Sequence, residues 1–142
     1  MGGDFHMIQI IYGKKGSGKT KRIIDMANEA VKAHEGSIVF IDDDNSYMFE
    51  LRHQIRFINA TEYAIKNTDQ FLGFLGGILA SNYDLSLLFI DGFLRIINEP
   101  LDQMESFFEL LEQYAEKAAV TLVLSVSGPD AEAPDFIKKY VI

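Results

Sequence analysis

Strand-sized apolar runs alternate with a helical period in the first third of the chain. Ile8 to Tyr12 and Ser37 to Ile41 are short apolar runs next to glycine, which predicts two strands. From Lys19 onward, apolar positions recur at the spacing of one helix face. These positions are Ile23, Ala27, Ala30, Val31 and His34. The pattern therefore predicts a strand, a loop, a helix and a second strand in succession.

The rest of the chain continues this alternation. The predicted strands are an edge strand at Ile55 to Ile58 and buried strands at Leu85 to Ile90 and Val120 to Val126. The predicted helices run from about Asp69 to Ala80 with Thr68 as cap, from Pro100 to Ala118, and from Asp135 to Tyr140. Strands separated by helices imply a mostly parallel sheet, here of four or five strands, because each parallel return needs a crossover. We therefore expect an α/β three-layer sandwich with helices on both faces.

Length and composition favour one compact domain. The chain has 142 residues, of which 48% are hydrophobic and 24% charged, as in globular proteins. We expect a single domain over residues 7–142, with Met1 to His6 as a cloning remnant ahead of a native start at Met7. The longest apolar runs are strand-sized and too short for a membrane span, so we expect a cytoplasmic protein.

Charge and cysteine content exclude some kinds of site. The formal net charge of -8 repels polyanions, which disfavours a broad nucleic-acid surface but leaves room for a local basic loop that binds phosphate. The chain has no cysteine, so disulfides, thiolate metal sites and thiol nucleophiles are excluded. In parallel sheets, ligands bind beyond the carboxyl ends of the strands. Candidate chemistry is therefore sought after Tyr12, Ile41, Ile90 and Val126.

A glycine-rich loop follows the first predicted strand. Gly13 to Thr20 reads G-K-K-G-S-G-K-T, which matches the phosphate-loop (Walker A) pattern between a strand and a helix. Its glycines allow the backbone amides to converge on a phosphate; Lys19 is expected to reach the β and γ phosphates and Thr20 to bind Mg²⁺. The residues assigned to nucleotide binding are Gly13, Gly16, Ser17, Gly18, Lys19, Thr20 and Lys21. The alternative is an ordinary glycine-rich turn, and Lys14 and Lys15 are interpreted as solvent-facing charge.

With this loop, the sequence resembles the P-loop nucleoside triphosphatases. Leu87 to Asp91 is an apolar strand that ends in an aspartate and looks like the second magnesium motif of that superfamily, although Asp-Gly after a strand is also a turn signal. The resemblance implies that Thr20 and Asp91 hold Mg²⁺ beside a bound nucleotide. Many hydrolytic members have a glutamate directly after the aspartate, where this chain has Gly92.

A second acidic segment, Phe40 to Asp44, reads F-I-D-D-D and is similar to a stretch of RecA-like recombinases. Asp44 falls on the position of their catalytic glutamate. Its side chain is one methylene shorter, so the resemblance implies slow hydrolysis. The alternative is that the three acids only cap a loop. Ser125 and Ser127 are candidates for sensing the γ phosphate or for plain turn chemistry, and Arg52, Arg56 and Arg95 are candidate arginine fingers.

These features favour a magnesium-dependent ATP-binding protein of RecA-like type, either a slow ATPase or a switch acting with a protein partner or a second copy. The chain also looks like small stand-alone bacterial P-loop proteins that are sometimes labelled relatives of twitching-motility ATPases. Adenine is favoured because no Asn-Lys-x-Asp guanine-reading tetrad occurs. Two alternatives stay open: a nucleoside or small-molecule kinase similar to thymidine kinases, and a non-catalytic nucleotide-binding interaction module. Strand order discriminates, because a RecA-like sheet inserts the Val120 strand between the Ile8 and Leu87 strands.

Overall fold

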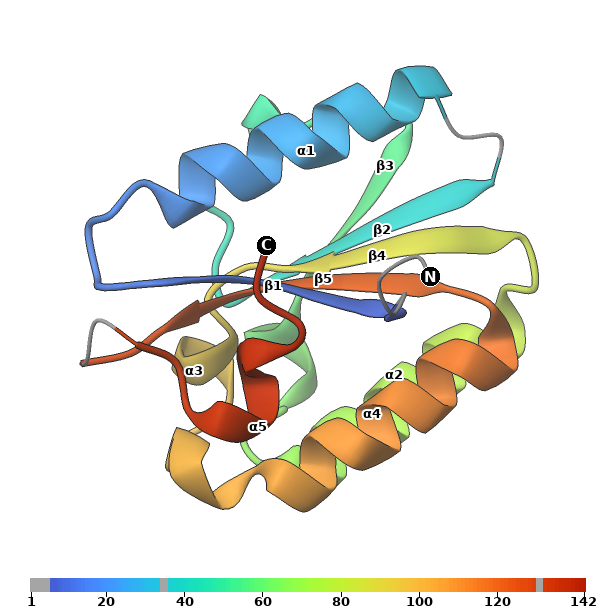
Figure 1. Ribbon diagram of the computed structural model, residues 1–142. Helices are drawn as coiled ribbons and strands as arrows, with labels where there is room; N and C mark the ends of the chain where they lie inside the picture. The colour runs from blue at the N-terminus through green and yellow to red at the C-terminus, as the bar shows by residue number, and fades with distance from the viewer. Residues whose placement is uncertain (1–5, 34–35, 130–131) are drawn as a thin grey trace, which may run out of the picture.

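The computed structural model describes residues 6–33, 36–129 and 132–142, and it contains one five-stranded sheet. The strands are β1 (Ile8–Gly13), β2 (Ser37–Asp42), β3 (Ile55–Asn59), β4 (Leu85–Ile90) and β5 (Thr121–Ser127). The helices are α1 (Lys19–Ala33), α2 (Thr68–Ser81), α3 (Phe93–Ile96), α4 (Glu105–Ala118) and α5 (Asp135–Lys138). Short 3₁₀ turns lie at Met48–Glu50, Ala60–Tyr63 and Leu101–Gln103. Helices cover both faces of the sheet, so the predicted three-layer α/β sandwich is confirmed (Figure 1).

The sheet has the strand order β1-β5-β4-β2-β3, and each pair of neighbouring strands is parallel. β5 therefore lies between β1 and β4, which is the order expected of a RecA-like sheet. A kinase-like sheet with β1 and β4 side by side was the alternative, and the strand order does not agree with it. All the carboxyl ends of the strands point to one edge of the sheet, where the loops after β1, β2, β4 and β5 meet.

The two faces of the sheet bury different side chains. On one face α1 packs Ile23 and Ala27 against the strands, together with a stacked pair formed by Phe40 and Phe89. The opposite face, under α2 and α4, is rich in aromatic residues. Its rings make edge-on and stacked contacts with one another; they include Phe71, Phe93, Phe107 and Phe108. These continuous apolar layers hold the strand ends, and therefore the loops that follow them, in fixed positions.

Most predicted elements are present, with differences at their boundaries. The edge strand and the buried strand over Leu85–Ile90 are found where predicted. Thr68 was predicted as the cap of α2, but the cap is Asn67, whose side chain accepts a hydrogen bond from the Gln70 amide. The Thr68 amide is instead held by Glu99 at 2.6 Å. Pro100 precedes a 3₁₀ turn rather than opening α4, and the single-turn helix α3 was not predicted.

Two sequence expectations fall partly outside the described residues. His34, predicted on the apolar face of α1, and residues 1–5 of the expected cloning remnant are not described. His6 is described: its ring stands edge-on to Tyr140 and its Nδ1 lies 3.0 Å from Glu112. Within the described residues, none of the helices combines the length and the apolarity that a bilayer crossing requires.

Candidate functional site

The loop between β1 and α1 has the backbone curl that its glycines allow. Gly16 and Gly18 have φ angles of 81° and 87°, which side-chain-bearing residues rarely adopt. The Ser17 amide donates to the Lys14 carbonyl oxygen at 3.2 Å, which closes a turn. α1 then begins at Lys19, so the free amide groups and the positive dipole end of this helix lie beside the loop. This local geometry is suited to an anion.

The lysines of the loop take different positions. Lys19 folds back over the loop, and its Nζ donates to the Lys14 carbonyl oxygen at 2.7 Å and to Ser17 Oγ at 3.3 Å. Burial lowers the pKa of Lys19, an effect that the charge of Asp91 opposes. Lys21 points along α1 to Asp25 at 2.8 Å, so its side chain does not join the loop. Lys14 and Lys15 are exposed, in agreement with their interpretation as solvent-facing charge.

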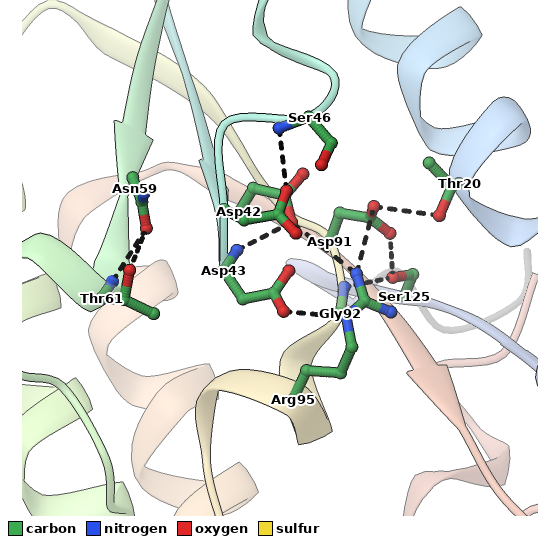
Figure 2. Close-up of polar contacts among 11 residues, drawn as sticks. Thr20, Asp42, Asp43, Ser46, Asn59, Thr61, Asp91, Gly92, Arg95 and Ser125 are labelled. Carbon is green, nitrogen blue, oxygen red and sulfur yellow. Dashed lines mark hydrogen bonds and ion pairs between the residues drawn. The ribbon is translucent and has the colours of Figure 1, made fainter.

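Thr20 and Asp91 meet across the edge of the sheet, although 71 positions separate them in sequence. The Thr20 hydroxyl donates to Asp91 Oδ2 at 3.0 Å (Figure 2). The other carboxylate oxygen, Asp91 Oδ1, accepts from the Ser125 hydroxyl at 2.5 Å, and Ser125 Oγ in turn accepts from the Gly92 amide at 2.8 Å. Asp91 is only 1% exposed. Its carboxylate is therefore held in one orientation by groups from α1 and β5.

An acidic cluster, defined here as Asp42, Asp43 and Asp91, surrounds one guanidinium group. Arg95 Nε donates to Asp43 Oδ2 at 3.1 Å, and Arg95 Nη2 lies 3.7 Å from Asp42 Oδ1 and 3.8 Å from Asp91 Oδ2. Figure 2 shows Arg95 reaching toward the three carboxylates from α3. Burial would lower the pKa of Arg95, but its hydrogen bond to Asp43 and the nearby carboxylate charges raise it. Arg95 is thus a permanent cation at this edge.

Asp42 and Asp43 are in direct contact: the Asp43 amide donates to Asp42 Oδ1 at 2.7 Å. As carboxylates, Asp42 Oδ2 and Asp43 Oδ1 are buried and have no hydrogen-bond partner among the described residues. Burial, followed by the hydrogen bond to Asp43, raises the pKa of Asp42 to about 8. Burial would raise the pKa of Asp43 as well, but Arg95 and Asp42 lower it. The environment therefore favours the protonated form of Asp42, and the closest partner of Arg95 is Asp43.

The third acid of the F-I-D-D-D segment, Asp44, is exposed and accepts a hydrogen bond from the Ser46 amide at 2.9 Å. One oxygen each of Asp42, Asp43 and Asp44 lies within 4.8 Å of the others. Mg²⁺ prefers hard oxygen ligands, and the oxygens of Thr20 and Asp91, which lie 3.0 Å apart beside the phosphate loop, fit such an ion. The residues present are thus compatible with a magnesium site.

Sequence reasoning missed two roles at this site. Ser125 was a candidate for contact with a γ phosphate, but the residue is 2% exposed and its hydroxyl is hydrogen-bonded to Asp91 and Gly92, so it orients the carboxylate. Arg95 was a candidate finger for a neighbour's nucleotide, but it pairs with acids of its own chain. The position of Arg95 four residues after Asp91, in a turn that follows the strand, was the sequence signal that could have indicated this pairing. Arg52 and Arg56 are exposed, and Ser127 ends β5 opposite Gly13.

Comparison with known proteins adds information on the fold. No protein-family model matches the chain, and no curated protein sequence is similar to it. Among solved structures, the chain is similar to the flagellar accessory protein FlaH from Methanocaldococcus jannaschii, with a TM-score of 0.52 and 13% sequence identity. The similarity covers 96% of this chain and 67% of that one. At this identity the likeness shows a shared α/β fold with a parallel sheet flanked by helices, in agreement with the RecA-like strand order.

Proposed function

We propose that the protein binds ATP with Mg²⁺ at the loop Gly13 to Thr20 and acts as a slow ATPase or a nucleotide-dependent switch. The observation that carries this proposal is the hydrogen bond from Thr20 to Asp91 at 3.0 Å. A glycine-rich turn without function gives no reason for the first helical hydroxyl to meet a buried aspartate at the end of β4. A metal site beside a phosphate loop accounts for that arrangement, because both a hydroxyl and a carboxylate are oxygen ligands for Mg²⁺.

Each residue then has a defined task. The curled amides around Gly16 and Gly18 and the start of α1 bind the phosphate oxygens. Lys19 leaves the Lys14 carbonyl and turns its ammonium group to the β and γ phosphates. Thr20 and Asp91 hold the metal, while Ser125 keeps the Asp91 carboxylate oriented. When bound, Mg²⁺ supplies charge that offsets the charge of the phosphates.

Whether turnover follows binding depends on Asp44 in this proposal. Asp44 follows β2 at the same edge of the sheet and is exposed, so its carboxylate is accessible to a water molecule near the terminal phosphate. Its short side chain and its bond to the Ser46 amide are consistent with slow hydrolysis. We expect Asp44→Asn to abolish hydrolysis while ATP binding persists. Turnover that equals the buffer rate in the unaltered protein would favour the binding-only switch, and stimulation by a nucleoside acceptor would favour a kinase.

The decisive experiment is calorimetric titration of the protein with ATP in the presence of Mg²⁺. We expect Lys19→Ala to lose about 100-fold in affinity, because one ammonium group facing the β and γ phosphates is removed. Lys32→Ala is the matched control, since Lys32 lies on the same helix in an exposed ion pair with Glu29 and should bind ATP normally. Absence of heat and of thermal stabilisation at millimolar ATP in the unaltered protein would overturn the proposal.

A switch needs a target, and we infer that it is a protein partner or a second copy of the chain. The net charge of -8 makes nucleic acid an unsuitable target. Sedimentation with and without Mg²⁺ and ATP tests the second copy directly. A nucleotide-dependent increase in mass would identify it.

A further inference from the structure

Arg95 lies where a divalent cation would otherwise be expected. Its guanidinium group is within 3.1 to 3.8 Å of oxygens from all three members of the acidic cluster. Asp91 Oδ2, which accepts the Thr20 hydroxyl, is also the oxygen that faces Arg95 Nη2. A metal held by Thr20 and Asp91 would therefore have the guanidinium as its neighbour, and two cations would compete for the same carboxylates.

The backbone at Gly92 leaves space for this guanidinium. Gly92 has a φ of 69°, and a Cβ atom built on it would lie 2.3 Å from Arg95 Nη2 and 2.4 Å from Arg95 Cζ. Arg95 thus lies over the bare backbone of Gly92. A glutamate at this position, as in many hydrolytic P-loop proteins, would collide with the guanidinium. Gly92 and Arg95 consequently form one unit, in which the glycine provides the space that the arginine fills.

The Arg95 guanidinium is also able to move out of the acidic cluster. The Arg95 side chain is 50% exposed, whereas those of Asp42 and Asp91 are 1% exposed. Arg95 is carried by α3, a helix of a single turn, and its closest partner, Asp43, lies toward the outside of the cluster with 18% exposure. Rotation about the arginine side chain alone would move the charge into solvent, and the buried acids would stay in place.

We propose that Arg95 is an internal cation that neutralises the acidic cluster before metal binds, and that a divalent ion binds only when the guanidinium moves away. This inference depends on the proposed function, because it assumes that Thr20 and Asp91 form the metal site. Arg95 is then a gate on metal binding. It lowers the affinity of the protein for free metal ions, and it keeps the three acids in place while no metal is bound.

The test is a titration of nucleotide-free protein with Mn²⁺, in which free Mn²⁺ is counted by electron paramagnetic resonance. We expect Arg95→Gln to bind Mn²⁺ about tenfold more tightly than the unaltered protein, because the competing charge is gone. Arg56→Gln removes the same charge from an exposed position on β3 and should leave the Kd unchanged. Equal or weaker Mn²⁺ binding by Arg95→Gln, with a normal melting transition, would overturn the proposal.

A second readout follows the guanidinium itself. In ¹⁵N spectra the Nε–H signal of Arg95, assigned by its absence from Arg95→Gln, should be protected from solvent exchange by the bond to Asp43. Saturating Mg²⁺ and ATP should remove that protection, and a signal that stays protected would contradict the gate. If the unaltered protein fails to bind Mg²⁺ and ATP, the proposed function fails and the gate with it. If the unaltered protein binds Mg²⁺ and ATP normally, but Arg95→Gln leaves the Mn²⁺ Kd unchanged and the Arg95 Nε–H signal of the unaltered protein stays protected, only the gate fails.

Discussion

Two groups of carboxyl side chains in this protein are satisfied in different ways. The Glu112 cluster, defined as Glu112, Tyr140 and His6, gives each carboxylate oxygen its own partner: Tyr140 donates to Oε1 at 2.7 Å and His6 Nδ1 lies 3.0 Å from Oε2. In the acidic cluster, Asp42 and Asp43 each have a buried carboxyl oxygen that has no hydrogen-bond partner among the described residues. The Glu112 carboxylate is therefore fully paired among the described residues, whereas in our proposal the acidic cluster exchanges its arginine for a divalent cation.

Their positions explain this difference. Glu112 and Tyr140 join α4 to the segment after α5, and the Glu112 side chain is 20% exposed, so its charge stays partly hydrated. Burial and the hydrogen bond to Glu112 raise the pKa of Tyr140, which remains a donor at all ordinary pH values. Asp42 and Asp91 lie at the carboxyl ends of buried strands, where desolvation makes unpaired charge costly. The Glu112 cluster thus ties α4 to the end of the chain, and in the proposed function the acidic cluster serves a ligand.

The largest expected effect separates the two clusters by function. Asp91→Asn removes the charge opposite Thr20, and we expect the magnesium-dependent part of ATP affinity to fall about 100-fold. Glu112→Gln removes one charge from the other cluster and should leave ATP affinity unchanged. Calorimetric titration with Mg²⁺ and with EDTA measures both variants. Equal loss in the two variants would mean that the clusters do not differ in the way proposed.

The next effect is a pH dependence of stability that belongs to the acidic cluster. The pKa of Asp42 is raised in the folded protein to about 8 from an ordinary value of 3.8. Between these values the folded state keeps a proton that the unfolded state has released, so stability is greatest below the lower value and falls as pH rises toward the upper one. We expect the unaltered protein to lose up to about 1.4 kcal/mol per pH unit relative to Asp42→Asn over this interval.

Urea unfolding in EDTA, from about pH 5 to pH 7, measures this dependence. The lowered pKa of Asp43 acts at more acidic pH, below the interval, and does not disturb the comparison. Parallel stability curves for the unaltered protein and Asp42→Asn would show that Asp42 is ionised in the folded state.

The sequence predicted the phosphate loop and the strands better than it predicted the contacts within the acidic cluster. The sequence located all five strands because each contains a short apolar run of strand length. The proximity of Thr20 and Asp91 agrees with the family resemblance, which implied both as magnesium ligands, and with the common edge of parallel strands. The raised pKa of Asp42 depends on burial in three dimensions, which adjacent acids in a sequence do not reveal. The single turn of α3 is too short to give a period, so the return of Arg95 to Asp91 was not predicted.

A smaller effect is expected in the Glu112 cluster. Tyr140→Phe removes a donor from the Glu112 carboxylate while keeping the buried ring, and the free energy of unfolding should fall by about 1 to 2 kcal/mol. Tyr83→Phe is the matched control, because Tyr83 is fully exposed and its change should lie within about 0.5 kcal/mol of zero. Urea unfolding measures both variants, and ATP affinity should stay the same. A change in ATP affinity with Tyr140→Phe would end the separation of the two clusters.

The smallest expected effect concerns the space beneath Arg95. Gly92→Ala places a Cβ atom against the guanidinium and a side chain at a φ of 69°, which should cost about 1 kcal/mol of stability. Gly73→Ala is the contrasting control: Gly73 lies exposed in α2, and an added Cβ atom there would meet no neighbouring side chain within 4 Å, so the substitution should stabilise by about 0.5 kcal/mol.

Because the added Cβ pushes the guanidinium away from Asp91, Gly92→Ala should also tighten Mn²⁺ binding, by less than Arg95→Gln does. In the Arg95→Gln background the same glycine substitution has no guanidinium to displace, and its effect on Mn²⁺ affinity should vanish while its cost in stability remains. This double-mutant cycle separates backbone strain from competition between cations. If Gly92→Ala has an undiminished effect on Mn²⁺ affinity in that background, the glycine acts on the metal site without Arg95. The acidic cluster would then lack the internal cation that distinguishes it from the Glu112 cluster.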